Sequence, residues 1–457
     1  MANDTAEGDD EADQAGSTST IGRRRFLALV LPVVVPIRQR SGATGTVVRP
    51  NERVVDVTTF AGVDPTGSSD SSAGLQRAVD ALDPTSGGVL LFPPGANLVV
   101  SRTVRLPAWE TEDKPHYQLR LTGYGARVLT RGDNAILSRT ASGAAERDAD
   151  RMARRISGGA GWKIEGLTFS GDMVPGSTAL QLDSMLGLLL ENVSFEGLDV
   201  GADLRWCLNT LFLTCRFTNC RTYGYRLGTV EKAGLNYSSN ACGEIRSRHF
   251  CRAGQRACVF VHQSSEYVST AGIFEGDDPE KTIEVQFNGH STSYGAHIAD
   301  AHIEHIPRQS FLHAVVAGNV VVERAFPQSA STRPYALVDA TGARGGQTVI
   351  VRDLHHAPES LRMKGEATNA ALFYFQNAHL PDWTDPKNWI DGVRPLTVWQ
   401  DRFNDPAGGG GPWRAVAADQ LRPANPYQLP GPAADAASTQ ALANELRNAL
   451  VRYGLAR

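Results

Sequence analysis

The sequence predicts an all-β protein, a single-stranded right-handed parallel β-helix with an N-terminal capping helix and a C-terminal helix. The first observation is a set of three decapeptides, WKIEGLTFSG (162–171), LLLENVSFEG (188–197) and TLFLTCRFTN (210–219). The spacing between successive decapeptides is too long for a heptad and too short for a domain. It indicates a structural unit that buries its apolar face by stacking on its neighbours. The second observation is that the segments are short, contain Phe, Val and Thr, and are joined by polar turns without a helix, which is typical of strands.

The decapeptides share apolar third, sixth and eighth positions, which we expect to face the core. These positions are Ile164, Leu167 and Phe169, then Leu190, Val193 and Phe195, then Phe212, Cys215 and Phe217. Between the strands, Gly166, Asn192 and Thr214 occupy one position where the chain bends, since turn-forming side chains are tolerated there.

Residues 1–45 form a polar N-terminal region followed by a targeting signal. Arg23, Arg24 and Arg25 precede Phe26 and an apolar run, Leu27–Ile37, and basic residues follow it. This arrangement resembles a twin-arginine export signal, which implies a secreted or extracytoplasmic bacterial protein. A bilayer requires about 20 helical residues, so the apolar run is too short for a stable membrane span.

The segment from Val54 to Ser101 predicts a cap on the open end of the solenoid. Ser69–Ser72 offer helix N-caps, and Leu75, Val79 and Leu82 form one helical stripe that ends before Gly87-Gly88. A buried strand, Val89–Phe92, follows and is stopped by Pro93-Pro94-Gly95. A short amphipathic helix in this position covers the strand edges and the apolar first coil.

This N-terminal segment also resembles a known family. The residues that carry the resemblance are Phe60, GVDPTG (62–67), Leu75-Gln76-x-Ala78, GGVLLFPPG (87–95) and LRLTGYG (119–125). They look like the signature of the pectate-lyase-like superfamily, specifically the rhamnogalacturonase/epimerase-type β-helix domain. Asn97-Leu98 stands where that family usually has a Tyr. The resemblance implies a parallel β-helix, over residues 46–403, in a superfamily that includes hydrolases, lyases, epimerases and non-catalytic binders.

Downstream of the decapeptides, apolar residues recur in pairs, but Arg248, Arg324 and Arg352 fall where core residues are expected. The pattern therefore allows a shift of one or two residues in the assignment of the positions that face inward. The pairs are Ile245/Phe250, Val268/Ile273, Ile298/Ile303, Val321/Phe326, Val349/Leu354 and Phe375/Leu380.

Three further segments interrupt or follow the coils. The charged, Ala-rich stretch 138–161 is either a groove wall on the binding face or a solvated loop. Residues 404–437 are rich in Gly and Pro and predict a linker, and residues 438–457 carry a helical stripe of Leu442, Leu446 and Leu450.

The six cysteines lie between Cys207 and Cys258. Proteins carried by the twin-arginine route normally fold in the reducing cytosol, so we expect mostly free, buried thiols, with Cys215 acting as a small apolar core residue. No CxxC spacing is present, which argues against a structural zinc site.

The densest group of titratable residues lies between Phe274 and His313. Glu275 follows Phe274 as Glu304 follows Ile303, which predicts two carboxylates on neighbouring coils, about 5 Å apart as in retaining glycosidases, or two coils apart as in inverting ones. One of two close carboxyls is expected to have a raised pKa. The candidate catalytic residues are Glu275, Asp277, Asp278, His302, Glu304 and His305. His302 and His305 are expected on opposite faces of a strand, which argues against a shared metal.

The net charge of −4 and the 7% aromatic content do not indicate a nucleic-acid partner and are compatible with a glycan. The motifs of polygalacturonases and pectate lyases are incomplete in this sequence. We therefore expect an exported carbohydrate-active enzyme acting on a polysaccharide, a glycoside hydrolase before a polysaccharide lyase, or else a non-catalytic glycan-binding or tailspike-like structural protein. No cofactor is indicated, calcium is expected only for a lyase, and the protein is either a monomer or a homotrimer.

Overall fold

The computed structural model divides the chain into Met1–Arg49, which lies outside the described residues, and Pro50–Arg457, which holds every described element. The structure describes residues 53–82, 87–109, 119–139, 158–228, 239, 241–262, 266–286, 295–316, 318–327, 333–342, 347–354, 357–365, 372–376, 383, 385–392, 397–400 and 414–415.

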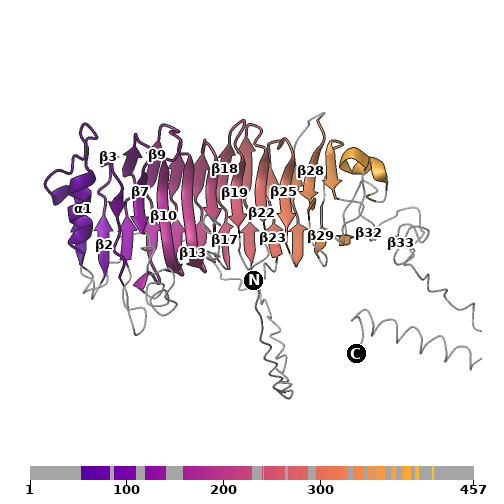
Figure 1. Ribbon diagram of the computed structural model, residues 1–457, viewed down its shortest axis with the longest axis horizontal. Coiled ribbons are helices and arrows are strands. Elements are labelled where there is room, and N and C mark those ends of the chain that lie inside the picture. The colour runs from indigo at the N-terminus through magenta and orange to yellow at the C-terminus, as the bar shows by residue number, and fades with distance from the viewer. Residues whose placement is uncertain are drawn as a thin grey trace, which may run out of the picture. The chain divides into compact units, whose positions relative to one another are not determined.

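Three parallel sheets run along the length of the folded unit, and successive coils contribute one strand to each sheet in turn (Figure 1). The pairing is parallel throughout, except that the last two strands of the largest sheet pair antiparallel. The prediction of a right-handed parallel β-helix is therefore confirmed.

The fourteen-stranded sheet has the first strand of each coil. It contains β1 (Val54–Asp56), β2 (Gly88–Leu91), β5 (Leu119–Thr122), β8 (Lys163–Glu165), β11 (Leu189–Glu191), β14 (Leu211–Leu213), β17 (Cys242–Ile245), β20 (Tyr267–Thr270), β23 (Gly295–Ala299), β26 (Asn319–Glu323), β29 (Thr348–Arg352), β31 (Leu372–Gln376), β32 (Thr397–Gln400) and β33 (Arg414–Ala415).

The nine-stranded sheet has the second strand of each coil. It contains β3 (Asn97–Val100), β6 (Arg127–Thr130), β9 (Thr168–Gly171), β12 (Ser194–Glu196), β15 (Arg216–Thr218), β18 (Arg248–Cys251), β21 (Ile273–Gly276), β24 (His302–Ile303) and β27 (Phe326–Pro327).

The ten-stranded sheet has the third strand. It contains β4 (Val104–Arg105), β7 (Ala135–Arg139), β10 (Thr178–Leu186), β13 (Val200–Leu208), β16 (Tyr223–Leu227), β19 (Ala257–His262), β22 (Lys281–Gln286), β25 (Ser310–Val315), β28 (Tyr335–Asp339) and β30 (Leu361–Lys364).

The N-terminal cap is α1 (Ser72–Asp80), at the indigo end in Figure 1. Leu75, Val79 and Leu82 are buried against the core, as the helical stripe predicts. The helix ends at Ala81, six residues before Gly87. Short 3₁₀ turns lie at Val57–Thr59 (η1), Pro386–Asn388 (η3) and Ile390–Gly392 (η4).

The three decapeptides stack as predicted. Phe169, Phe195 and Phe217 are paired in register on β9, β12 and β15, and all are buried. The ring centroids of Phe195 and Phe217 lie 4.8 Å apart and nearly parallel, a spacing set by the distance between neighbouring strands. Cys215 is buried beside them, as expected.

The bend between the first and second sheets uses left-handed backbone. Gly166, Asn192 and Thr214 have φ of 68°, 52° and 52°, which confirms their predicted position at the bend. The N–H of Asn192 donates to the Leu213 carbonyl at 3.0 Å, so each bend is tied to the next coil. The same conformation recurs in later coils, at Arg246, Ala271, Asp300, Arg324 and Asp353.

Two neighbouring coils, those of Ile245 and Ile273, differ from the predicted register. Ile245 and Phe250 are exposed, and the buried positions of that coil are occupied by Glu244 and His249. In the next coil Phe274 is buried, one position beyond the predicted Ile273. Polar residues in the core hide the true inward positions from a hydrophobic pattern, which is why the prediction slips by one residue.

Further along, Ile298, Ile303, Val349, Leu354 and Phe375 are buried as predicted, and Leu380 lies outside the described residues. In the coil between them Phe326 is exposed and Val322, not Val321, is buried. The arginines that seemed to occupy core positions point outward or lie at a bend. These are Arg248, Arg324 and Arg352.

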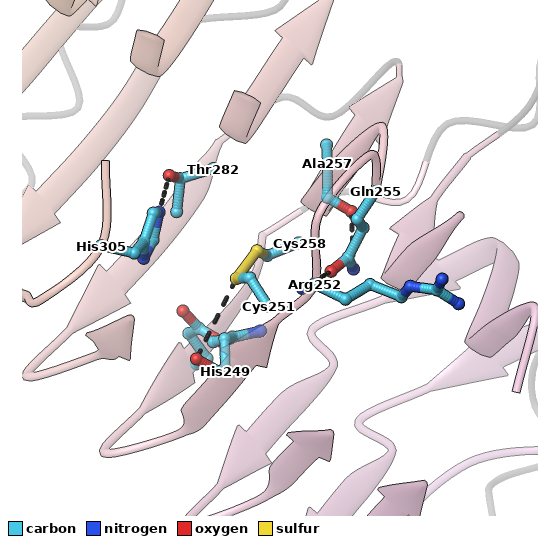
Figure 2. Close-up of a disulfide and its surroundings, with 9 residues drawn as sticks. His249, Cys251, Arg252, Gln255, Ala257, Cys258, Thr282 and His305 are labelled. Carbon is cyan, nitrogen blue, oxygen red and sulfur yellow. Dashed lines mark hydrogen bonds and ion pairs between the residues drawn. A yellow bond between two sulfur atoms is a disulfide. The ribbon is translucent and has the colours of Figure 1, made fainter. Parts of the chain in front are cut away.

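The cysteines divide into one disulfide and four thiols. Cys251 and Cys258 are bonded across the turn from β18 to β19 (Figure 2), whereas Cys207, Cys215, Cys220 and Cys242 are free and buried. The expectation of mostly free thiols is confirmed for these four and is wrong for the bonded pair, because the turn brings the ends of two consecutive strands together.

Several predicted segments lie outside the described residues. These are the export signal, most of 138–161, and the C-terminal helix at 438–457. Within 404–437 the structure describes only β33. Across the described ranges no helix is both long and apolar enough to span a bilayer.

Candidate functional site

The outer face of the nine-stranded sheet carries two rows of side chains that run along the solenoid axis. Because side chains alternate along a strand, the residues on either side of each buried core position point outward. The first row is Arg127, Thr168, Ser194, Arg216, Arg248, Ile273, His302 and Phe326. The second row is Glu196, Thr218, Phe250 and Glu275, and Glu304 continues it in the next coil.

Two aromatic rings on this face are open to solvent. Phe250 and Phe326 are each 42% exposed, although they belong to a residue type that is usually buried. A third ring, Tyr124, is 50% exposed and lies over the bend at Gly166, where a Cβ atom would approach the ring to 2.6 Å. The face thus has apolar platforms at intervals among polar groups.

His302 and Glu304 form a hydrogen-bonded pair at the surface. His302 Nε2 lies 2.6 Å from Glu304 Oε1, and the two side chains are 32% and 45% exposed. His302 lies in β24 and Glu304 directly follows the strand, and both point outward, on either side of the buried Ile303. A carboxylate bonded to one ring nitrogen fixes the orientation of the ring.

Glu275 lies one coil before Glu304, as predicted, since Phe274 pairs with Ile303. Its carboxylate is not free, because the Arg248 guanidinium binds both of its oxygens, with Nη2 to Oε2 at 2.8 Å. The negative charge of Glu275 is therefore neutralised by the Arg248 guanidinium.

Asp277 and Asp278 follow β21 in the turn towards the ten-stranded sheet. Asp277 is exposed, and Asp278 binds Arg333 at 2.9 Å. The turn carries these two carboxylates away from the rows on the sheet.

His305 points into the core, opposite to His302, in agreement with the expectation that they lie on different faces. It is buried, Thr282 Oγ1 lies 2.5 Å from its Nε2, and burial lowers its pKa to about 4 (Figure 2). His305 does not share a face with Glu304, so the two residues do not form one site.

Sequence reasoning missed a second cluster on the outer face of the ten-stranded sheet. Glu284 is buried there beneath Lys281, Gln286, Arg256 and His313, with Lys281 Nζ at 2.6 Å. Burial alone would raise the pKa of Glu284, but the hydrogen bonds from His313 and Lys281 outweigh it and lower the pKa to about 2. His313 and Glu284 are directly paired in register, a relationship that appears only once the coil spacing is known.

The carboxyl groups show a common electrostatic behaviour. Every described carboxyl whose pKa departs from its ordinary value has it lowered; besides Glu284 these are Asp64, Asp70, Glu165, Glu244, Asp300, Glu323 and Asp385. No raised carboxyl pKa, the property expected of a general acid, is found among the described residues.

In the described ranges no group of three or more His, Cys, Asp and Glu side chains is placed to share a metal ion.

No family model and no curated protein matches this sequence. Solved structures share its architecture. The A-module of mannuronan C-5 epimerase AlgE6 from Azotobacter vinelandii is 13% identical, with 78% of this chain and 82% of that chain covered and a TM-score of 0.43. The AlgE4 A-module of the same organism is 12% identical, with 71% and 87% covered and a TM-score of 0.47.

A tailspike protein of E. coli bacteriophage HK620, in complex with a pentasaccharide, is 11% identical, with a TM-score of 0.46. The match covers 70% of this chain and 62% of the tailspike chain. This chain is a parallel β-helix protein. Because the sequence identities are only 11–13%, the similarity between this β-helix protein and the three solved structures concerns the fold alone.

Proposed function

We propose that this β-helix protein binds a polysaccharide along the outer face of the nine-stranded sheet. The observation that carries the proposal is the pair of outward rows, in which side chains of successive coils lie about 4.8 Å apart along one axis and include hydroxyl, guanidinium and aromatic groups. A long polymer matches such a surface better than a small molecule does, because successive coils offer further contacts along the axis.

Phe250 and Phe326 supply the apolar part of this surface. Exposed rings stack on the apolar faces of sugars, while neighbouring hydroxyl and charged groups bond the sugar hydroxyls.

The test is a binding screen of the mature protein against plant, algal and bacterial polysaccharides by affinity electrophoresis. We expect at least one polymer to bind, and Phe250→Ala with Phe326→Ala to weaken it at least tenfold, or about 1.4 kcal/mol. Val54→Ala, which alters an exposed apolar residue at the N-terminal end, is the control. Unchanged binding by the double Phe variant would place the glycan elsewhere.

A second candidate is catalysis on the bound polymer, favoured by the His302–Glu304 pair. The sequence favours a hydrolase before a lyase, but hydrolysis by paired carboxyls needs one of them protonated, and Glu275 is neutralised by Arg248. The geometry supports His302 as the group that moves a proton, with Glu304 orienting it. Reducing ends and the absorbance of unsaturated products, measured together, distinguish hydrolysis, elimination and binding alone.

We also propose that the protein acts outside the cytoplasm. The twin arginines before Phe26 and the Cys251–Cys258 disulfide both support this location, since disulfides persist in oxidising compartments. Replacing Arg23, Arg24 and Arg25 by Lys should retain the protein in the cytoplasm, as seen by cell fractionation. Export of that variant at the wild-type level would refute the signal.

A further inference from the structure

Three arginines lie on or directly beside the proposed polysaccharide face. Arg216 on β15 pairs directly in register with Arg248 on β18, so their strands lie about 4.8 Å apart. Arg246 lies at the left-handed bend two residues before Arg248, with φ of 53°. All three residues are exposed.

Only one of the three is neutralised. Arg248 is bound by Glu275 through two hydrogen bonds. Arg216 and Arg246 have no ion-pair or hydrogen-bond partner for their side chains within the described part of the chain. Their positive charges are therefore available to a ligand.

None of the in-register neighbours of Arg216 and Arg246 is a carboxylate. In register, Arg216 lies next to Ser194, and the Arg246 bend lies between the bends at Thr214 and Ala271. Of the acids of the face, Glu275 is already bound by Arg248, and two others lie to either side. Glu196 is one coil earlier and is 3.8 Å from Arg127, and Glu304 lies two coils after Arg248, bonded to His302. An anion on this face is thus favoured at β15 and β18 and disfavoured beyond them.

Resting on the proposed function, we propose that Arg216 and Arg246 form a subsite for an anionic substituent, a carboxylate or a sulfate, on the bound polysaccharide. The planar guanidinium group binds such oxygen pairs through two parallel hydrogen bonds. Arg216 lies three coils before His302, about 14 Å along the axis, and Arg246 belongs to the next coil, two coils before His302. The subsite therefore selects the polymer at a distance from the His302–Glu304 pair.

The experiment uses two matched pairs of polymers and the full mature chain. One pair is polygalacturonate and its carboxyl-reduced form, and the other is dextran sulfate and dextran. Binding is measured by affinity electrophoresis at low and high salt for the wild type, for Arg216→Gln with Arg246→Gln, and for the control Arg308→Gln. Arg308 is exposed in the turn before β25, away from this face.

We expect the wild type to bind a charged polymer at least tenfold more tightly than its uncharged counterpart, with the difference reduced by salt. The Arg216/Arg246 variant should lose that preference, and Arg308→Gln should keep it. The pair of polymers that shows the effect identifies the substituent as carboxylate or sulfate.

Equal binding of charged and uncharged polymers by the wild type would overturn the anionic subsite. So would full retention of the preference by the Arg216/Arg246 variant. Neither outcome affects the glycan face itself, which the Phe250 and Phe326 variants test in the wider screen. Absence of binding to all four polymers would also refute the subsite.

Discussion

His249 Nε2 lies 2.8 Å from a carboxylate oxygen of Glu244 in the interior of the solenoid, where both side chains are almost completely buried. The imidazole is stacked between the rings of Phe217 and Phe274, with centroids 4.9 Å away on each side. His249 thus occupies the position that phenylalanine takes in the preceding and following coils.

Removing one member of this pair should strongly destabilise the fold. Burial alone would raise the pKa of Glu244, but the interaction with His249 and hydrogen bonds such as that from Ser269 lower it. His249→Phe leaves Glu244 buried without its main partner, which we expect to cost about 3–5 kcal/mol of unfolding free energy in urea denaturation. The double change Glu244→Leu with His249→Phe should recover most of that loss, since apolar replacements of a buried pair are often neutral. If His249→Phe alone were as stable as the wild type, the predicted role of the His249–Glu244 pair would be contradicted.

Glu284 should give the protein an acid-sensitive stability. Its pKa is lowered from 4.5 to about 2 in the folded state, so its contribution is complete above pH 4.5 and is lost as the pH falls towards 2. Melting temperatures measured between pH 2 and pH 6 should therefore fall less steeply for Glu284→Gln than for the wild type. Asp277→Asn, at an exposed carboxyl, is the control and should leave the slope unchanged.

Gly166→Ala should destabilise the bend between the first two sheets. A left-handed conformation costs an L-residue about 1–2 kcal/mol, and here the new Cβ would also meet the Tyr124 ring. We expect Gly166→Ala to lower the free energy of unfolding, measured with a denaturant, by about 2 kcal/mol. Gly187→Ala has a similar φ of 66° but no atom within 4 Å of the new Cβ, so it should lose less. Equal losses would show that the Tyr124 contact is unimportant.

The disulfide between Cys251 and Cys258 should appear in thiol counting. The unreduced protein, unfolded in guanidinium, should react with four equivalents of a thiol reagent, and the reduced protein with six. The double variant Cys251→Ser with Cys258→Ser lacks the loop that the disulfide closes in the unfolded chain. The chain-entropy model therefore predicts that its free energy of unfolding is lower by about 2.5 kcal/mol. Six reactive thiols without reduction would exclude the bond.

If the bound polymer is also cleaved, Glu304→Gln should abolish or strongly reduce the activity. The amide is a weaker hydrogen-bond partner for the His302 ring than the carboxylate and holds its orientation less firmly, so we expect the loss mainly in kcat. Glu275→Gln, which removes a carboxylate already neutralised by Arg248, should have the smaller effect. Wild-type cleavage by Glu304→Gln would exclude the pair from catalysis.

The sequence predicts the first part of the solenoid well, because Phe169, Phe195 and Phe217 repeat one apolar position without interruption. It fails at the coil that contains Glu244, since a hydrophobic pattern assigns the inward position to the neighbouring Ile245. The same error of one residue limits the site. Glu275, His302 and Glu304 do share an outer face, whereas His305 turns inward and Asp277 and Asp278 leave the sheet with the turn.

The left-handed bends have a consequence for how such a protein can change. Each bend fixes its backbone through bonds to the next coil, as between Asn192 and Leu213, and leaves its side chain outside the core. The bend residues Asn192, Thr214 and Arg246 can therefore be exchanged without repacking the interior. Each bend residue can thus change independently of the others. Gain or loss of a coil would lengthen or shorten the proposed ligand-binding face by one whole coil.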